Sequence, residues 1–560
     1  MGISHKFSAT KLAVGFVAAL MLPIIILTFT ERYPILITVS SILLPLGAYM
    51  MFAALSKRSG RMVWWGGVFI FLSAFQIVLS YLFGNSVIAA DMFLNLITTN
   101  SGEASELLRN IYPAIIVVCI IYIPLLWVAT VHLINRVVMP SSLRRNISVA
   151  GLASFLLGLW MLNIGTLEDK FSVALRDDIF PINACYNLAL SISEAHKINN
   201  YTKSSEGFVY NATRSDSATM REIYVLVIGE ASRAANWQLY GYKRKTTPLL
   251  AKRDDVILFR GVTTQSNTTH KSVPMLLSSV SPTEHNMLYY RKGLPTLFNE
   301  AGFETYFISN QSPQGAMIDH LAADADHTIY IDGEQYDSKM VELMNRIIKT
   351  SPSQKMLFIL HSYGSHFSYR KRYPREYAKF LPDDDISISQ ENMEHIRNAY
   401  DNSILYTDYF LSEVIRSLRA YDNACSAMLY CSDHGEDLMD DRRNRFLHSS
   451  PTTSYYQLHI AALAWFSPYY DRYFSDKVSA ARYNASNAAT THSVFHTMAD
   501  IASIQSPYFR PSVSLVSREF DPTISRRYIN DHNRAVPLDR RIGIDASQRS
   551  LFRRAGVAMP

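Results

Sequence analysis

The stretch Ile223-Tyr-Val-Leu-Val-Ile-Gly-Glu230 decides the fold of the second half of the chain. Its run of apolar residues predicts a short buried strand, and a glutamate follows almost directly. A second run, Ala427-Met-Leu-Tyr-Cys431, is followed in the same way by Asp433 and His434. Because ligands bind outside the carboxyl ends of the strands in a parallel sheet, we expect these side chains to converge on one metal ion.

Outward from these two runs, apolar segments alternate with helical patterns from residue 221 onward. Such alternation favours an α/β domain with a mostly parallel sheet. The candidate strands are 223–228, 256–259, 304–308, 356–360, 426–431 and 460–466. The candidate helices include 273–280, 293–301, 337–350, 391–420 and 490–503.

The N-terminal part of the chain is strongly apolar up to about residue 165. Five stretches approach the roughly 20 apolar residues that cross a bilayer; they are 12–29, 34–55, 63–83, 112–133 and 147–165. The segment Phe171–Lys197 mixes apolar and charged residues as a helix on a membrane surface does. The sequence therefore predicts a five-helix membrane domain (1–165), a linker with an interfacial helix (166–220) and an α/β domain (221–560).

Positive charge predicts the orientation in the membrane. One set of loops is rich in basic residues, namely Lys6, Lys11, Lys57, Arg58, Arg61, Arg136, Arg144 and Arg145. The opposite set carries mainly Arg32 and Arg109. By the positive-inside rule the N-terminus is cytoplasmic, and an odd number of spans places the α/β domain outside. We expect a multi-pass protein of a bacterial inner membrane with its α/β domain in the periplasm.

Composition excludes some classes of function. The net charge of +6 suits an anionic partner, but no RNA- or DNA-binding motif is present, so we expect no nucleic-acid partner. Of the four cysteines, Cys119 lies in a predicted span, and Cys185, Cys425 and Cys431 form no disulfide framework. The exported domain must therefore be stabilised by its core.

Further chemistry-bearing residues follow other predicted elements. Thr269 precedes a helical pattern, where backbone N–H groups and the helix dipole bind a phosphoryl group. A metal or a base could activate its hydroxyl, and this role is compatible with Thr268 or Thr269 capping the helix. His366 follows the strand 356–360, and His448 follows the Asp-His pair, so each is a candidate ligand or proton donor. We interpret His492 and His496 as structural.

Taken together, these segments resemble the lipopolysaccharide phosphoethanolamine transferases. That family includes the lipid A enzymes and the mobile colistin-resistance enzymes, and it belongs to the alkaline phosphatase/sulfatase superfamily. The matching segments keep their order across residues 223–467; they are Val227-Ile-Gly-Glu-Ala-Ser-Arg233, Gly241-Tyr-Lys-Arg-Lys-Thr-Thr-Pro248, Thr268-Thr-His-Lys-Ser-Val-Pro274, Gly364-Ser-His-Phe367, Tyr373-Pro374, Tyr400-Asp-Asn402, Ser432-Asp-His-Gly-Glu436 and Leu447-His448.

The resemblance implies a role for each site residue. The zinc ligands would be Glu230, Thr269, Asp433 and His434, with manganese as another possible metal. Thr269 would also be the nucleophile, and His366 and His448 would lie in the second shell or bind a second metal. Asn95, Thr99 and Glu103 match a family pattern that helps bind the donor headgroup, whereas their spacing of four alone favours a solvated helix face.

The resemblance also implies a reaction. Phosphoethanolamine would pass from phosphatidylethanolamine to Thr269, and then to lipid A, the lipopolysaccharide core or another envelope glycan. The added amine would reduce surface negative charge and so protect against cationic antimicrobial peptides. We expect a monomer. The alternatives are a phosphoglycerol transferase acting on a periplasmic glucan or teichoic-type polymer, a hydrolase of the sulfatase or phosphodiesterase kind, and a non-catalytic membrane sensor.

Two departures from the family pattern stand out. The family usually has disulfides in the periplasmic domain, including one around the nucleophile, where this chain has Ser266 and Met275. The family also often has a phosphate-binding lysine after a segment similar to Phe307-Ile-Ser-Asn-Gln311, and the nearest match here is Gln314. We therefore expect packing alone to hold the nucleophile loop.

Overall fold

The computed structural model describes most of the 560 residues. The described ranges are 8–30, 34–83, 87–98, 101–166, 171–214, 220–333, 335–384, 388–440, 445–449, 453–530 and 532–538, and the side chains of 82–83, 95–98 and 101–110 are not described. Contacts divide the chain into two compact units, one formed by most residues up to Ser193 and the other by most residues from Glu194 onward. The domain boundaries given above remain predictions.

The first unit is helical. Its helices are α1 (Ala9–Thr30), α2 (Ile35–Ala54), α3 (Ser59–Trp65), α4 (Gly67–Phe83), α5 (Ala90–Thr98), α6 (Ser101–Ile134), α7 (Ser141–Gly165), α8 (Phe171–Asp177) and the start of α9 (Ile182–Asn199). Among the described residues, four helices are long and apolar enough to cross a membrane: α1, α2, α7 and the part of α6 from Ile111. The predicted third span is a pair, α3 and α4, bent by 59°, and counting this pair as one span gives five.

Close helix packing in this unit depends on small residues. Helices α2 and α7 approach so closely at Gly47 that a Cβ atom there would lie 2.5 Å from the carbonyl oxygen of Gly151. The hydroxyl of Ser40 donates a hydrogen bond to the carbonyl of Gly158 at 2.8 Å. Such contacts replace the hydrophobic driving force that is missing between helices in lipid.

The predicted interfacial helix 171–197 is instead two helices, α8 and α9. The break between them contains Pro181, which has no backbone N–H and restricts the residue before it. A buried tyrosine anchors part of the polar segment that follows α9. Tyr210 is fully buried, and its N–H donates to Glu300 Oε1 at 2.8 Å.

The second unit is built on a seven-stranded sheet with the order β3-β11-β8-β2-β7-β5-β6. Strands β8, β2, β7, β5 and β6 are parallel, whereas β11 runs antiparallel to both β8 and β3. The strands are β2 (Arg221–Gly229), β3 (Val256–Leu258), β5 (Glu304–Ser309), β6 (His327–Tyr330), β7 (Lys355–His361), β8 (Ala424–Ser432) and β11 (Ala462–Phe466). The central strands β2 and β8 are buried along almost their whole length, as their continuous apolar runs require.

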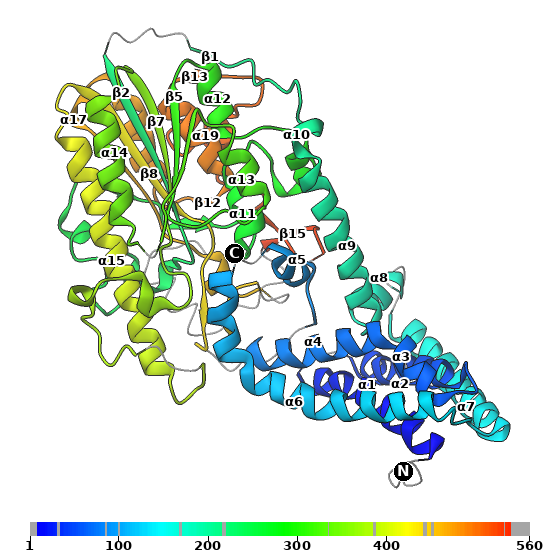
Figure 1. The fold of residues 1–560 in the computed structure, drawn as a ribbon. Helices are drawn as coiled ribbons and strands as arrows, with labels where there is room; N and C mark the ends of the chain where they lie inside the picture. Colours follow the sequence, from blue (N-terminus) through cyan, green and yellow to red (C-terminus); the bar gives the residue numbers. More distant parts are fainter. Residues whose placement is uncertain are drawn as a thin grey trace. The chain divides into compact units, whose positions relative to one another are not determined.

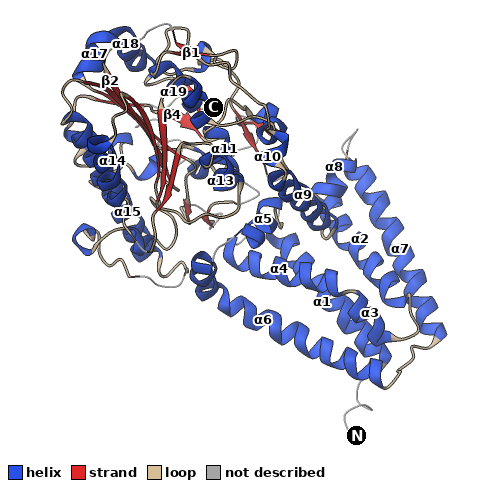
Figure 2. Ribbon diagram, turned by 45° about the horizontal axis from the view of Figure 1, so that its top comes forward, coloured by secondary structure: helices blue, strands red, loops and turns tan. Residues whose placement is uncertain are grey.

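Helices cover both faces of this sheet. Figures 1 and 2 show α14 (Ser338–Thr350) and α15 (Met393–Arg419) along one face, and α11 (Thr269–Leu276), α13 (Met317–Ala322) and α19 (His492–Ile501) on the other. The remaining helices are α10 (Tyr201–Ser204), α12 (Leu294–Glu300), α16 (Tyr455–Leu458), α17 (Pro468–Tyr473) and α18 (Ser475–Asn484). The short strands are β1 (Thr213–Arg214), β4 (Gly261–Thr263), β9 (Asp437–Leu438), β10 (Phe446–Leu447), β12 (Ala488–Thr490), β13 (Ile504–Gln505), β14 (Arg527–Ile529) and β15 (Ala535–Pro537).

This architecture confirms the predicted α/β fold with a mostly parallel sheet. All six predicted strands are present in the sheet, and four of the predicted helices correspond to α12, α14, α15 and α19. The prediction for 273–280 was wrong in its bounds, because α11 begins at Thr269 and ends at Leu276. The N–H groups of Lys271 and Ser272 both donate to the carbonyl of Thr268, so the first turn closes before Pro274.

Candidate metal centre

The register of two neighbouring strands positions the first site residues. In the parallel pair of β2 and β8, Gly229 lies opposite Ser432, so Glu230 and Asp433 are the next residues on each strand. Both side chains are fully buried. The backbone N–H of Ala231 donates to Asp433 Oδ1 at 3.1 Å, which ties the two strand ends together. This edge of the sheet is where ligands bind in parallel α/β folds.

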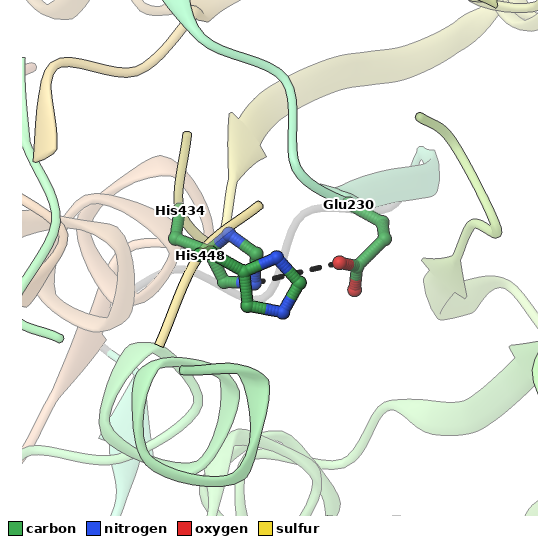
Figure 3. Close-up of side chains that lie close together, drawn as sticks. All are labelled: Glu230, His434 and His448. Atoms are coloured by element: carbon green, nitrogen blue, oxygen red, sulfur yellow. Dashed lines mark ion pairs between the residues drawn. The ribbon is translucent and has the colours of Figure 1, made fainter. Parts of the chain in front are cut away.

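The structure brings four predicted residues together at this edge (Figure 3 labels two of them, Glu230 and His434). His434 Nε2 lies 3.4 Å from Glu230 Oε1 and 3.3 Å from Asp433 Oδ2. The hydroxyl of Thr269, the first residue of α11, lies 3.0 Å from His434 Nε2 and 3.4 Å from Glu230 Oε2. Two carboxylates, an imidazole and a hydroxyl therefore surround one point.

A backbone contact fixes the tautomer of His434. Its Nδ1 lies 2.9 Å from the carbonyl oxygen of Gly435, which can only accept, so the ring proton is on Nδ1 and the lone pair on Nε2 faces the cluster. Burial lowers the pKa of His434, which favours the neutral ring. A neutral histidine held in this way is the usual form of a metal ligand.

His448 joins the same cluster. Ligand atoms of Glu230, His434 and His448 all lie within 4.8 Å of one another, and the two imidazole rings are 4.0 Å apart between centroids (Figure 3). Nδ1 of His448 lies 2.9 Å from Glu436 Oε2, and the hydroxyl of Tyr369 donates to Glu436 Oε1 at 2.7 Å. Burial raises the pKa of Glu436 to about 8. Through its contact with Nδ1, Glu436 thus orients the imidazole ring of His448.

The other predicted site residues are less closely tied to this point. His366 is half-buried, its Nδ1 lies 2.6 Å from the carbonyl oxygen of Phe367, and it is not among the residues whose ligand atoms share the 4.8 Å cluster. Asn95, Thr99 and Glu103 lie outside the residues whose side chains are described. Their roles remain predictions.

A side chain that the sequence analysis overlooked also reaches the cluster. The amide of Gln311 donates to Glu230 Oε2 at 3.2 Å and to the carbonyl of Ser362 at 2.8 Å. Gln314, the position compared with the family's lysine, instead donates its backbone N–H to Asp319. The only local signal for Gln311 is its place two residues after β5, at the same sheet edge.

The loop after β7 presses against Glu230. Gly364 adopts the left-handed region with φ of 47°, and a Cβ atom there would lie 2.8 Å from the carbonyl oxygen of Glu230 and 2.9 Å from its nitrogen. Buried Asp337 accepts hydrogen bonds from the N–H groups of Tyr363 and Gly364, at 2.8 and 2.9 Å. Only glycine fits this contact without a shift of the glutamate backbone.

The donor set fits a divalent cation. Within the described part of the chain, His434 is the only basic side chain within 4 Å of the Asp433 carboxylate, and its neutral ring supplies no positive charge, although that carboxylate has no exposed surface. A buried carboxylate is costly unless a cation compensates it. Carboxylate, imidazole and hydroxyl donors suit zinc or manganese. Glu230, Thr269, Asp433 and His434 would hold such an ion, and His448 is close enough to contribute.

Comparison with known proteins identifies the family of the domain that contains this site. Residues 222–504, about half of the chain, match the sulfatase family. The chain belongs to the sulfatase family. Glu230, Thr269, Asp433, His434 and the other residues of the metal cluster all lie inside this sulfatase-family domain.

Two curated relatives that are named as transferases match about half of the chain. The chain is 32% identical over 271 residues to the putative transferase YhbX of Escherichia coli K12, with 47% of each chain covered. It is 30% identical over 304 residues to phosphoethanolamine transferase EptA of Salmonella typhimurium, with 52% of this chain and 55% of the relative covered. The chain spans about half the length of the curated relatives it matches.

Solved structures extend the likeness to the whole fold. The integral membrane phosphoethanolamine transferase A of Neisseria meningitidis is 21% identical, with a TM-score of 0.70 over 91% of this chain and 96% of that one. The C-terminal periplasmic domain of EptC from Escherichia coli, in complex with Zn, is 24% identical, with a TM-score of 0.53 over 59% of this chain and 96% of that one. The fold of the helical unit and the fold of the sulfatase-family domain are thus both found in solved structures.

The contact at Gly364 yields a direct test of the site. We expect Gly364→Ala to destabilise the protein by about 1–3 kcal/mol and to reduce bound metal, because the new Cβ displaces the Glu230 backbone. Gly302→Ala is the matched control: its φ of 82° carries the same backbone strain, but nothing lies within 4 Å of its Cβ position. Thermal unfolding and elemental analysis measure both effects. Equal metal content in the two variants would show that Gly364 does not support the site.

Proposed function

We propose that the protein transfers phosphoethanolamine from phosphatidylethanolamine to a lipopolysaccharide or another envelope glycan, through an adduct on Thr269. The observation that carries this proposal is the Thr269 hydroxyl, 3.0 Å from His434 Nε2 at the start of α11. It stands in a sulfatase-family domain whose relatives include a phosphoethanolamine transferase. The helical unit suits a membrane-embedded donor, with the sulfatase-family domain in the periplasm.

In the first step, Thr269 Oγ1 forms a bond to the phosphorus of the donor while the bond from phosphorus to the diacylglycerol oxygen breaks. When bound at this site, a zinc ion would supply Lewis acidity, lowering the pKa of an oxygen ligand and offsetting phosphoryl charge. The positive end of the α11 dipole favours the same charge. His448, oriented by Glu436, is proposed to take the proton that leaves Thr269 Oγ1 and to give it to the departing diacylglycerol oxygen.

In the second step, a hydroxyl or phosphate oxygen of the acceptor forms a bond to the same phosphorus. The bond between phosphorus and Thr269 Oγ1 breaks, and the proton that the acceptor oxygen loses passes through His448 to Thr269 Oγ1. The product carries the ethanolamine phosphate, and the protein returns to its starting state. Asn95, Thr99 and Glu103 are proposed to recognise the ammonium and phosphate groups of the donor.

The intermediate can be tested by intact-mass spectrometry. We expect the full chain, incubated with phosphatidylethanolamine, to gain the mass of phosphoethanolamine on Thr269. Thr269→Ala should reduce this adduct by about a thousandfold or more, as loss of a covalent nucleophile does in other enzymes. Thr268→Ala is the control, because Thr268 is the neighbouring buried hydroxyl at the helix cap.

Each outcome of this measurement is informative. An adduct with the mass of phosphoglycerol, formed from a phosphoglycerol donor, would favour the alternative transferase. An adduct that survives in Thr269→Ala and disappears in Thr268→Ala would move the nucleophile by one residue.

Donor recognition can be tested separately through Glu103. We expect Glu103→Gln to lower the rate of transfer from phosphatidylethanolamine, because a carboxylate that pairs with the ethanolamine ammonium is lost. Bound zinc should not change. With a short water-soluble phosphodiester the loss should be smaller. A wild-type rate on phosphatidylethanolamine would remove Glu103 from the proposed headgroup site.

A further inference from the structure

A cavity lies in the sulfatase-family unit, and none of its lining residues belongs to the candidate metal site formed by Glu230, Thr269, Asp433, His434 and His448. Its volume is about 310 Å³. The 3₁₀ helix Pro282–Tyr289, strand β12, the first turn of α19 and the segment 510–527 form its walls. This volume matches the lower end of small-molecule sites.

Positive charge dominates the lining. Three arginines, Arg510, Arg526 and Arg527, line the cavity, against a single acidic lining residue, Asp521. One carboxylate oxygen of Asp521 already accepts hydrogen bonds from the N–H and hydroxyl of Thr523, at 2.9 and 2.6 Å. The cavity therefore carries an excess of positive charge that suits an anion.

Two of these arginines have no counter-charge in the described ranges of the chain. Arg510 lies 3.7 Å from Glu284, whereas no ion pair joins Arg526 or Arg527 to a described carboxylate. The Nη1 atom of Arg526 is shielded from solvent and makes no hydrogen bond to a described residue. The guanidinium interacts with the Tyr455 hydroxyl, which is neutral because burial raises its pKa. Shielding a guanidinium nitrogen in this way is unfavourable unless a ligand binds it.

The rest of the lining supplies neutral hydrogen-bonding groups and an apolar wall. Thr490 ends β12, and His492 and Ser493 begin α19, where the helix dipole favours an anion. Burial lowers the pKa of His492 to about 4, so its ring is neutral at neutral pH. Phe520 and Ile524 offer an apolar surface beside these polar groups. A charged group on a ring with hydroxyls, such as a sugar phosphate, matches this combination.

We propose that this cavity binds the phosphate of a phosphorylated sugar through Arg526 and Arg527. Strand β14, which begins at Arg527, also contacts the segment that leads to Thr269. The N–H of Ile529 in β14 donates to the carbonyl of Gln265 at 2.7 Å, and the hydroxyl of Thr491 donates to Gln265 Oε1 at 3.1 Å. Both β14 and the residue that precedes α19 therefore contact Gln265, which lies four positions before Thr269.

The test measures binding of glucosamine 1-phosphate to the full chain in detergent by calorimetry, before and after a chelator removes bound metal. Glycerol 3-phosphate and inorganic phosphate are the comparison probes, and they separate a sugar phosphate from a lipid headgroup or a free ion. The variants are Arg527→Gln alone and Arg526→Gln with Arg527→Gln. Arg518→Gln is the matched control, because Arg518 is an exposed arginine paired with Asp476 outside the cavity.

We expect glucosamine 1-phosphate to bind more tightly than either comparison probe, and to bind equally well without metal. Each arginine variant should weaken this binding by about tenfold or more, since charge-assisted hydrogen bonds to phosphate are lost. Arg518→Gln should bind like the wild type. Arg527→Gln alone keeps the test valid if the double variant does not fold.

Three results would overturn the proposal. Wild-type affinity in the Arg527→Gln variant would exclude the cavity as the binding site. Loss of all binding when the metal is removed would assign the probe to the metal cluster. Tighter binding of inorganic phosphate or glycerol 3-phosphate would reject the sugar as part of the ligand.

Discussion

The convergence of buried carboxylates at the ends of β2 and β8 is the constraint on which the site depends. The parallel register places Glu230 and Asp433 side by side, and the sheet buries both completely. Two adjacent negative charges in a low-dielectric interior repel each other strongly. Gln311 offsets part of this cost by donating to Glu230, whereas the lone pair of neutral His434 faces both carboxylates and offsets none of it. The remaining compensation is the role that we assign to a bound cation.

Packing and backbone hydrogen bonds hold the centre without disulfides. All four cysteines are described, and none forms a disulfide. The loop after Glu230 is fixed by Tyr400, which donates to the carbonyl of Ala231 at 2.6 Å and accepts from the N–H of Arg233 at 3.0 Å. The segment that precedes Thr269 is tied to the end of β8 by the hydroxyl of Thr264, which donates to the carbonyl of Asp433. Hydrogen bonds between segments that are distant in sequence thus hold these loops in place without disulfides.

The sheet could be predicted from sequence because its inner strands are buried on both faces. Continuous apolar runs such as 223–228 are stable only when they are buried, so the positions of these strands can be predicted from the sequence. Strand β6 was missed because His327–Tyr330 is short and lies at the edge, with partly exposed side chains that give no apolar run. The bend between α3 and α4 was missed because composition alone does not separate a straight span from a broken one.

The site was predictable where the residues follow a strand, and not where loops bring them back. Glu230, Asp433 and His434 follow directly from β2 and β8. By sequence, His366 and His448 are equivalent candidates, yet of the two only His448 belongs to the group of ligand atoms within 4.8 Å of one another. The reason is the pairing of β9 with β10: Leu447 lies opposite Asp437, so His448 returns beside Glu436. Such a register between two-residue strands leaves no pattern in the sequence.

Anomalous X-ray scattering at the zinc edge, on crystals of the full chain grown with zinc, tests the central claim most directly. We expect a strong peak among Glu230, Thr269, Asp433 and His434, and its loss in Asp433→Asn while the fold is kept. A protein that binds no zinc there, or a peak that survives unchanged in Asp433→Asn, would show that these residues do not hold the ion.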